Sequence, residues 1–385
     1  MKNWPRMVAA VTAVVVMSAA WGGVWAAMPM DLGAGPGAAG SKTAARKTTS
    51  RKVGKFSRAK ARTKAAHKPA RRSKSAKVNK AAARKTITPA PPAPLVETTP
   101  IEYRLAWQIA LDRVGFSPGV IDGHPRAKTA LATREFQVSI GLPSTGQLDQ
   151  PTAAALGVNE AGAIRTYTVS QEDLSQVGPL PSTWIEKSKV SRLPYPSLDQ
   201  ALAERFHCSR ALLAELNPGM DLAHLPAGAV IRAPAVEAYG RFSPSADVAV
   251  INVNFSQKAI RLYSSPDGGR CVGLVHCSIA KDKAKLPSGK ARVAVISPNP
   301  TYGFDPAMWP EVKGVTHKLI IPPGPRNPVG LCWVGLSLKG YGIHGTPNPE
   351  LIGKTGSHGC IRLANWDAVR LGKTVKVGTP VTFSM

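Results

Sequence analysis

The segment from Lys42 to Lys85 most restricts how this chain can fold, because it carries 18 lysine and arginine residues and no aspartate or glutamate. It shows no apolar periodicity, and a proline-rich stretch that ends at Pro94 follows it. Such a composition buries too little apolar surface to offset the entropy cost of ordering the chain. Residues 27–100 are therefore predicted to be a disordered linker, first basic and rich in Ala, Lys and Arg, then rich in Pro. Folding is left to the residues that follow.

The first residues have the parts of a secretory signal. Lys2 and Arg6 give a positive start, Val8–Ala20 is almost wholly apolar, and a small residue, Ala26, precedes a plausible cleavage site. The apolar run is short for a membrane span, which needs roughly 20 apolar residues. Residues 1–26 are therefore predicted to be a signal peptide that exports the chain to the periplasm or cell wall, or a membrane anchor if the segment is not cleaved.

The formal net charge of +27 is concentrated in the basic segment, and the chain beyond it is only mildly basic. This asymmetry indicates a polyanionic partner for the tail and says little about the fold. Behind a signal peptide the available polyanions are wall polymers, lipid headgroups and lipopolysaccharide. Anionic envelope polymers are thus the predicted partner, and no nucleic acid is expected. A solvated linker without a specific partner is the alternative.

The cysteine count is odd, so at least one thiol of an exported chain is predicted to be unpaired. No spacing among the cysteines resembles a zinc site, and the sequence predicts neither a metal nor a cofactor. Sequence alone leaves disulfide pairing open for four of them. The five residues are Cys208, Cys271, Cys277, Cys332 and Cys360.

Residues 101–158 have the spacing of a small helical module. Apolar residues of a first helix precede a turn-rich loop, a second helix is predicted from Ala127 to Ile140, and a short third helix from Thr152 to Leu156. The segment resembles the peptidoglycan-binding domain 1 family, which implies binding of glycan strands or stem peptides; a purely structural three-helix spacer is the alternative. The matching residues are Leu105, Leu111, Gly115, Ile121-Asp122-Gly123, Thr129, Phe136-Gln137, Gly141-Leu142, Thr145-Gly146, Asp149, Thr152 and Leu156.

Residues 165–235 form a second small module with the predicted order strand, helix, helix, strand. The first helix is predicted from Leu198 to Phe206, Ser209 is suited to cap the second, and Asn217-Pro218-Gly219 ends it. This order and the Leu-x-x-x-Asn-Pro ending resemble a LysM domain, which implies glycan binding. An insertion separates the opening strand from the first helix, which departs from that family.

From about Ala246 the chain changes to β character, with Gly/Pro turns between short apolar strands that are typical of a sandwich or barrel. One helix is predicted from Trp366 to Leu371. The predicted strands span residues 248–254, 258–263, 272–276, 291–296 and 379–383.

Two short motifs in this region carry reactive side chains. Cysteine is the strongest nucleophile among side chains once it is a thiolate, and Cys360 has two histidines near it in sequence, His344 and His358. A Cys–His pair needs the imidazole within hydrogen-bond reach of the thiol. Gly359 lets a substrate backbone come close. Arg362, two residues after the cysteine, is suited to hold a substrate carboxylate.

These residues resemble the catalytic motif of the L,D-transpeptidase (YkuD) domain over residues 247–385. The motif is His-Gly, a gap and then Ser-His-Gly-Cys-x-Arg, and every element is present. Together with the two preceding modules, the resemblance implies a multidomain protein. Its mainly-β catalytic domain is preceded by a small three-helix peptidoglycan-binding domain and a small α+β LysM-like domain. The matching residues are His344-Gly345, Ser357-His358-Gly359-Cys360 and Arg362.

The resemblance also implies roles. Cys360 is the nucleophile that attacks a peptidoglycan stem tetrapeptide, His344 is the proton acceptor and donor, and the Gly345 backbone orients the imidazole. The acyl group on the enzyme is then transferred to an amine, which forms a cross-link or attaches a protein to peptidoglycan. The family is also acylated by carbapenems. Substrate binding and oxyanion stabilisation are implied for Ser357, His358, Gly359 and Arg362.

Three other functions remain compatible with the sequence. An L,D-carboxypeptidase of the same fold would use water as the acceptor. A non-catalytic wall-binding protein would use the modules as anchors, and a polyanion-binding protein would depend on the basic tail. The last two predict that Cys360→Ala has no effect.

Overall fold

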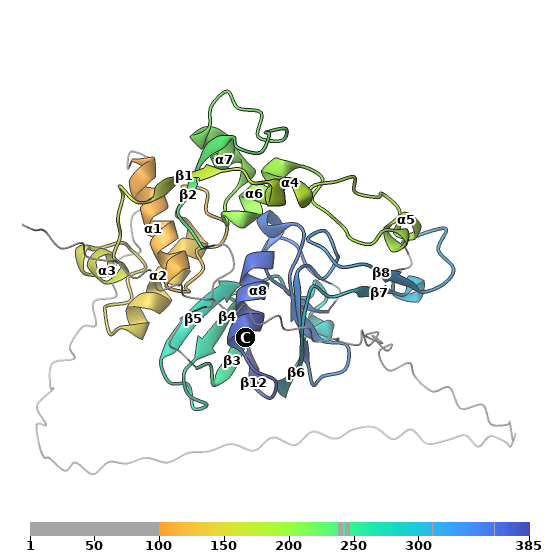
Figure 1. Ribbon diagram of the computed structural model, residues 1–385. Helices are drawn as coiled ribbons and strands as arrows, with labels where there is room; N and C mark the ends of the chain where they lie inside the picture. Colours follow the sequence, from red (N-terminus) through yellow and green to blue (C-terminus); the bar gives the residue numbers. More distant parts are fainter. Residues whose placement is uncertain (1–99, 238–241, 243–246, 310, 358) are drawn as a thin grey trace, which may run out of the picture.

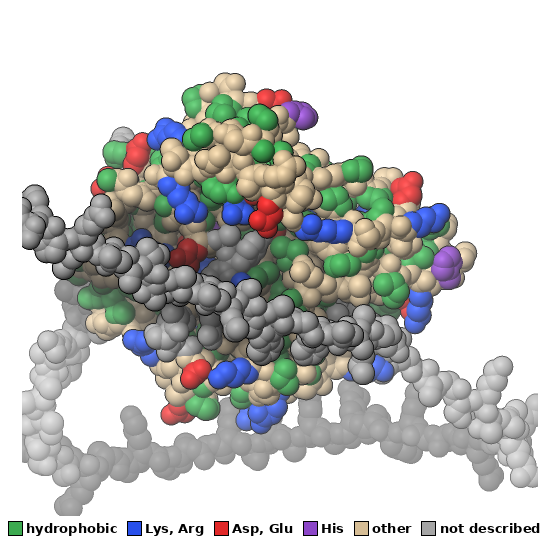
Figure 2. Space-filling model, in the orientation of Figure 1, with side chains coloured by type: hydrophobic (Ala, Val, Ile, Leu, Met, Phe, Trp, Pro, Cys, Tyr) green, Lys and Arg blue, Asp and Glu red, His purple; other side chains and the backbone are tan. Residues whose placement is uncertain are grey.

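The computed structural model describes residues 100–237, 242, 247–309, 311–357 and 359–385. The predicted signal peptide and nearly all of the predicted linker lie outside these residues, as does His358 of the motif. Within the described part, no helix is both long enough and apolar enough to cross a membrane. On the face shown in Figure 2, lysine and arginine side chains are spread among acidic and apolar ones and form no single basic patch.

The first module consists of the three predicted helices, α1 (Ile101–Arg113), α2 (Ala127–Ser139) and α3 (Gln150–Leu156). α3 begins where it does because the Asp149 side chain accepts a hydrogen bond from the backbone N–H of Thr152. Trp107 and Phe136 are buried between α1 and α2. The helical prediction for this module is therefore confirmed.

The second module pairs β1 (Ile164–Thr168) with β2 (Val230–Pro234) in an antiparallel ladder. Between them lie α6 (Leu198–Arg205) and α7 (Arg210–Leu216), and Ser209 caps α7 as predicted. The insertion before α6 contains two further short helices, α4 (Gln171–Ser175) and α5 (Trp184–Lys189). The predicted strand and helix order is confirmed, whereas the LysM resemblance stays a prediction.

The described strands of the C-terminal part form one curled sheet of eight strands in the order β11-β10-β9-β6-β12-β3-β4-β5. Figure 1 labels β3, β4, β5, β6 and β12 of this sheet. The expected sandwich or barrel is therefore wrong, since the described strands of this domain form one open sheet and a separate two-stranded hairpin, β7 (Tyr302–Phe304) with β8 (Leu319–Ile321). The sheet strands are β3 (Val250–Asn254), β4 (Ala259–Tyr263), β5 (Cys271–His276), β6 (Lys290–Pro298), β9 (Cys332–Leu336), β10 (Gly342–His344), β11 (Ile361–Arg362) and β12 (Pro380–Ser384).

One α-helix and three short 3-10 helices complete the described part of this domain. The helix α8 (Asn365–Thr374) packs on β6, β9 and β10, and its apolar side chains join the main core of the sheet. The 3-10 helices are η1 (Lys283–Lys285), η2 (Pro306–Met308) and η3 (Pro349–Leu351).

The three modules share their hydrophobic cores. Leu105 and Ile109 of α1 lie in one cluster with Leu202 of α6, and Trp107 lies in another with Leu274 of β5. The backbone of Leu274 also exchanges hydrogen bonds with the loop after α1, at 2.8 and 3.1 Å. Burial of apolar surface between modules is favourable in proportion to its area. The described modules therefore pack as one body.

A buried ionic network also joins the modules. Asp112 of α1 accepts a hydrogen bond from Arg370 of α8 at 2.9 Å and lies 3.1 Å from His207 Nδ1 of the second module. Burial alone would raise the pKa of Asp112, but Arg370 and His207 lower it to about 2. Asp367, which accepts from Ser117, has a pKa raised to about 7, chiefly by burial. Asp112 is thus stabilised as a carboxylate by Arg370 and His207, whereas burial favours the protonated form of Asp367.

Candidate active site

Two neighbouring strands at one edge of the sheet carry the predicted reactive residues. β10 and β11 pair in parallel, with Ile343 opposite Ile361 and His344 opposite Arg362. Both isoleucines are buried in the core. Because side chains alternate along a strand, His344 and Arg362 lie on the face opposite to those isoleucines. Cys360 directly precedes β11, two residues before Arg362, and so lies at the start of the strand that pairs with β10.

The His344 imidazole is held in one orientation. Its side chain is buried, and Nδ1 lies 2.7 Å from the carbonyl oxygen of Gly345. Because a carbonyl only accepts, Nδ1 carries the proton and Nε2 is left to accept one. The ring also stacks on Trp333 at a centroid distance of 5.6 Å. Burial, and to a lesser extent Arg362, lowers the pKa of His344 to about 4 although the bond to Gly345 opposes this.

Close packing requires a glycine at position 345, whose carbonyl orients His344. A Cβ at this position would lie 2.2 Å from Asn365 Oδ1, which is closer than real Cβ contacts come. Asn365 begins α8 and is fully buried, and its Oδ1 accepts from the backbone N–H of Leu331 at 3.0 Å. Its Nδ2 donates to Glu204 Oε1 of the second module, also at 3.0 Å. A side chain that sequence reasoning missed therefore packs against the backbone that orients His344.

Cys360 is the only one of the five cysteines, all of which lie in the described residues, that is not buried. None of them is in a disulfide, which resolves the pairing that the sequence left open. The Cys360 thiol lies 3.6 Å from the carbonyl oxygen of Gly340. Burial raises the pKa of Cys360, against a smaller lowering effect of Arg362. The thiol and the His344 imidazole are therefore both neutral near pH 7.

The backbone around Cys360 is braced by Ser357. The Ser357 hydroxyl accepts from the backbone N–H of Gly359 at 3.2 Å and donates to the carbonyl oxygen of Cys360. Among the described residues, no atom beyond the chain neighbours lies within 4 Å of where a Cβ on Gly359 would stand, which leaves space for a ligand on this side of the turn. The substrate and oxyanion roles predicted for Ser357 and Gly359 stay predictions, and His358 lies outside the described residues.

Arg362 is partly buried, and its guanidinium donates to the carbonyl oxygen of Gly356 at 3.3 Å. Burial lowers the pKa of Arg362, while the neighbouring Cys360 and Tyr302 raise it. A guanidinium has five N–H donors, and one of them makes this bond within the described part of the chain, so donors remain that a carboxylate could engage. Binding of a substrate carboxylate by Arg362 stays a prediction.

Tyr302 of the β7–β8 hairpin is a member of this site that the sequence did not indicate. Burial raises its pKa, Cys360 also raises it and Arg362 lowers it, so the phenol lies within electrostatic reach of both residues. Its hydroxyl accepts a hydrogen bond from Trp309 Nε1 at 3.0 Å. Asp305, which follows β7, caps η2 and pairs with Lys318 at 3.1 Å. Three-residue strands such as β7 are too short to give a periodic signal.

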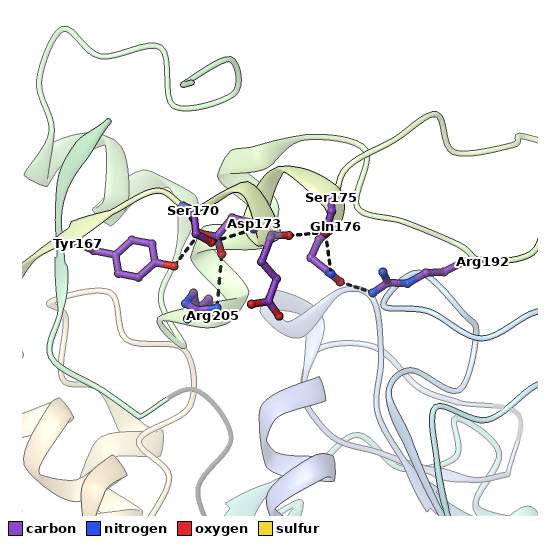
Figure 3. A network of polar contacts seen from close by, with 8 residues as sticks. Tyr167, Ser170, Asp173, Ser175, Gln176, Arg192 and Arg205 are labelled. Carbon is purple, nitrogen blue, oxygen red and sulfur yellow. Dashed lines mark hydrogen bonds and ion pairs between the residues drawn. The ribbon is translucent and has the colours of Figure 1, made fainter. Parts of the chain in front are cut away.

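A separate pocket of about 410 Å³ lies between the second module and the sheet. Figure 3 shows the polar network at its edge, in which Asp173 accepts from Tyr167 Oη at 2.6 Å and from the backbone N–H of Ser170 at 2.8 Å. Arg205 pairs with the same carboxylate at 3.4 Å. None of the predicted site residues lines this pocket. Nor does the described part of the chain contain a cluster of His, Cys, Asp or Glu suited to hold a metal ion.

The fold and the site define a class of enzyme that has a cysteine and an oriented histidine at the edge of a curled sheet. Similarity to known proteins identifies the family. Residues 249–383 match the family described as "L,D-transpeptidase catalytic domain" (YkuD), and residues 104–156 match the "Putative peptidoglycan binding domain". The chain belongs to the YkuD family of L,D-transpeptidases. It is an enzyme of that family with a helical peptidoglycan-binding-type domain ahead of the catalytic domain.

Individual relatives match part of this chain. "Putative L,D-transpeptidase YqjB" of Bacillus subtilis is 32% identical over 36% of this chain and 71% of its own length. "Putative L,D-transpeptidase YkuD" of Bacillus licheniformis is 29% identical over 48% of this chain and 92% of its own length. The crystal structure of L,D-transpeptidase 3 from Mycobacterium tuberculosis with a faropenem-derived adduct is 18% identical, covering 42% of this chain and 76% of that one with a TM-score of 0.28.

Proposed function

We propose that this protein is an exported L,D-transpeptidase that forms peptidoglycan cross-links, or attaches proteins to peptidoglycan, through an acyl-enzyme on Cys360. The observation that carries the proposal is the parallel pairing of β10 with β11, which brings His344 and Arg362 to one face beside Cys360. The match to the L,D-transpeptidase catalytic domain supports the choice of substrate class.

In the first step the Cys360 sulfur attacks the carbonyl carbon of the diamino acid that precedes the terminal D-Ala of a stem tetrapeptide. His344 accepts the thiol proton at Nε2, the nitrogen left free by the bond of Nδ1 to Gly345. The C–S bond forms, the amide C–N bond breaks, and His344 returns the proton to the departing amine of D-Ala. Both side chains start neutral, so proton transfer accompanies attack.

In the second step an acceptor amine attacks the thioester carbonyl. An amide bond forms, the C–S bond breaks, and the proton lost by the amine returns through His344 to the Cys360 sulfur. Water in place of the amine would release a tripeptide, which is the carboxypeptidase alternative. Backbone N–H groups near Gly359 and Cys360 stabilise the oxyanion of each step, and Arg362 holds a substrate carboxylate.

The predicted partners follow from this role. Residues 101–158, and residues 165–235 if they bind glycan, hold the enzyme on peptidoglycan strands. The basic tail adds attraction to anionic envelope polymers that salt weakens. Export of the chain to the periplasm or cell wall brings it to this substrate. A carbapenem acylates Cys360 by the same attack, because its β-lactam carbonyl replaces that of the stem peptide.

The experiment that tests the proposal is mass spectrometry of the products that the full chain forms from a disaccharide-tetrapeptide. A dimer that has lost one D-Ala is expected, and Cys360→Ala abolishes it. A tripeptide without dimer would replace transpeptidation by carboxypeptidation. If the substrate is unchanged and a carbapenem leaves no adduct on Cys360, the chain is a wall-binding protein instead.

A further inference from the structure

The insertion in the second module reaches the β7–β8 hairpin, which carries Tyr302. α5 lies beside β7 and β8 in Figure 1, far along the chain from them. The start of this helix is specified locally, because Thr183 and Glu186 form a capping box. Its first residue, Trp184, packs in one hydrophobic cluster with residues of the hairpin. A segment outside the catalytic domain therefore supports an element of the active site.

The Trp184 indole contacts three aromatic rings of the hairpin. It stacks on Phe304 at a centroid distance of 4.2 Å and an interplanar angle of 21°. The same ring lies 6.2 Å from Tyr302 and 5.9 Å from Trp309. Trp309 in turn donates the hydrogen bond that holds the Tyr302 hydroxyl. Aromatic pairs at such distances contribute beyond their buried area.

A second point of attachment fixes the insertion to the catalytic domain. Leu193, which is fully buried, donates its backbone N–H to the carbonyl oxygen of Pro323 at 2.9 Å. Its own carbonyl accepts from the backbone N–H of Arg326 at 3.4 Å. At Gly324 a Cβ would lie 2.3 Å from the Leu193 carbonyl oxygen, so only glycine permits this approach. The insertion is thus attached to the catalytic domain at a second point, which follows Trp184 in the chain.

The hairpin depends on such support. Each of its strands has three residues, and an isolated two-stranded ribbon is at best marginally stable in water. We propose that Trp184 is a positioning residue of the enzyme: it holds the hairpin that carries Tyr302, and this hairpin limits access to Cys360 and shapes the site for the stem-peptide donor. The identity of that donor rests on the proposed function, whereas the contact between Trp184 and the hairpin does not.

The test compares Trp184→Ala, Trp184→Phe and the control Lys187→Ala in the full chain. Lys187 lies over the Trp184 ring at 5.3 Å, in the same helix, and its removal leaves the ring on the hairpin. Two rates are measured for each variant: acylation of Cys360 by the tetrapeptide donor and alkylation of Cys360 by iodoacetamide. The other four cysteines are buried, so a single adduct in the folded protein reports Cys360.

Trp184→Ala is expected to slow acylation at least about tenfold, because small misplacements of positioning groups cost this much or more. Alkylation by the small reagent is expected to become several times faster, because the loosened hairpin uncovers the thiol. Trp184→Phe keeps a ring on Phe304 and should restore most of both rates, and Lys187→Ala should match the parent protein. A loss through global unfolding would instead expose the four buried cysteines to alkylation.

If both rates for folded Trp184→Ala stay within about twofold of the parent, or if Trp184→Phe restores neither, the positioning role is wrong. If the parent protein itself is not acylated by the tetrapeptide, the proposed function fails. The alkylation rates then still decide whether Trp184 holds a hairpin that limits access to the thiol.

Discussion

Protonation of His344 sets the low-pH limit of the reaction proposed for Cys360. Burial of the His344 imidazole moves that limit to lower pH. The pKa of this imidazole is lowered from 6.5 to about 4, which corresponds to about 3 kcal/mol against the charged form. With a pKa of about 4, about 90% of the imidazole is neutral at pH 5, whereas an ordinary histidine would be only about 3% neutral there. The acylation rate is therefore expected to change by no more than about twofold between about pH 5 and 8.

Single-turnover acylation by a carbapenem, followed by the loss of its ultraviolet absorbance, measures this profile. Circular dichroism at each pH confirms that the protein stays folded. The raised pKa of Cys360 predicts that the thiol remains protonated across the same range, so the rate does not follow the thiolate fraction. A rate that falls about 30-fold from pH 8 to pH 5 would show an imidazole with an ordinary pKa. A rate that rises tenfold per pH unit through this range would show that a free thiolate reacts without the neutral pair.

Two further predictions concern the supports of the site. Asp112→Asn is expected to lower the free energy of unfolding by about 3 kcal/mol at pH 7, because Arg370 loses its buried partner. Because the folded-state pKa of Asp112 is about 2, below the unfolded value, this stabilisation is present above about pH 4 and is lost as the pH falls towards 2. Asp247→Asn, in an exposed ion pair, is the control and should leave urea denaturation unchanged; equal losses would contradict the buried-network account. Asn365→Ala should slow acylation about tenfold or more by freeing the Gly345 backbone, and an unchanged rate would exclude that support.

Much of the fold follows from patterns that are local in the sequence. The helices at Ala127 and Leu198 have apolar residues at helical spacing, and Ser209 offers a cap, so each was predicted within a residue or two. The strands at Val250 and Ala259 alternate and were predicted too. Three strands were not predicted: β9, β10 and β11. Strands β10 and β11 have only three and two residues, which is too short for a periodic pattern. Strand β9 is buried along its whole length, so its residues do not alternate between apolar and polar.

The residues of the candidate site also fall into two groups: those that a local sequence motif identifies and those that it does not. Cys360, His344 and Arg362 were predicted from a short sequence motif. The two halves of this motif lie together in the structure because β10 pairs with β11. Tyr302 and Asn365 were missed, because contacts between segments far apart in sequence bring them to the site. The packing of the modules was missed for the same reason, since a hydrophobic face in sequence does not identify the surface that covers it.

The most direct test is intact-protein mass spectrometry of the full chain after brief mixing with a tetrapeptide stem whose side-chain amine is acetylated, so that the stem cannot act as an acceptor. The account predicts a mass increase equal to the stem minus D-Ala, located on the peptide that contains Cys360 and reversed by hydroxylamine, as expected of a thioester. His344→Ala should form this adduct far more slowly, and Cys360→Ala should not form it. An adduct on another residue, or D-Ala release that persists in Cys360→Ala, would contradict the assignment of the nucleophile.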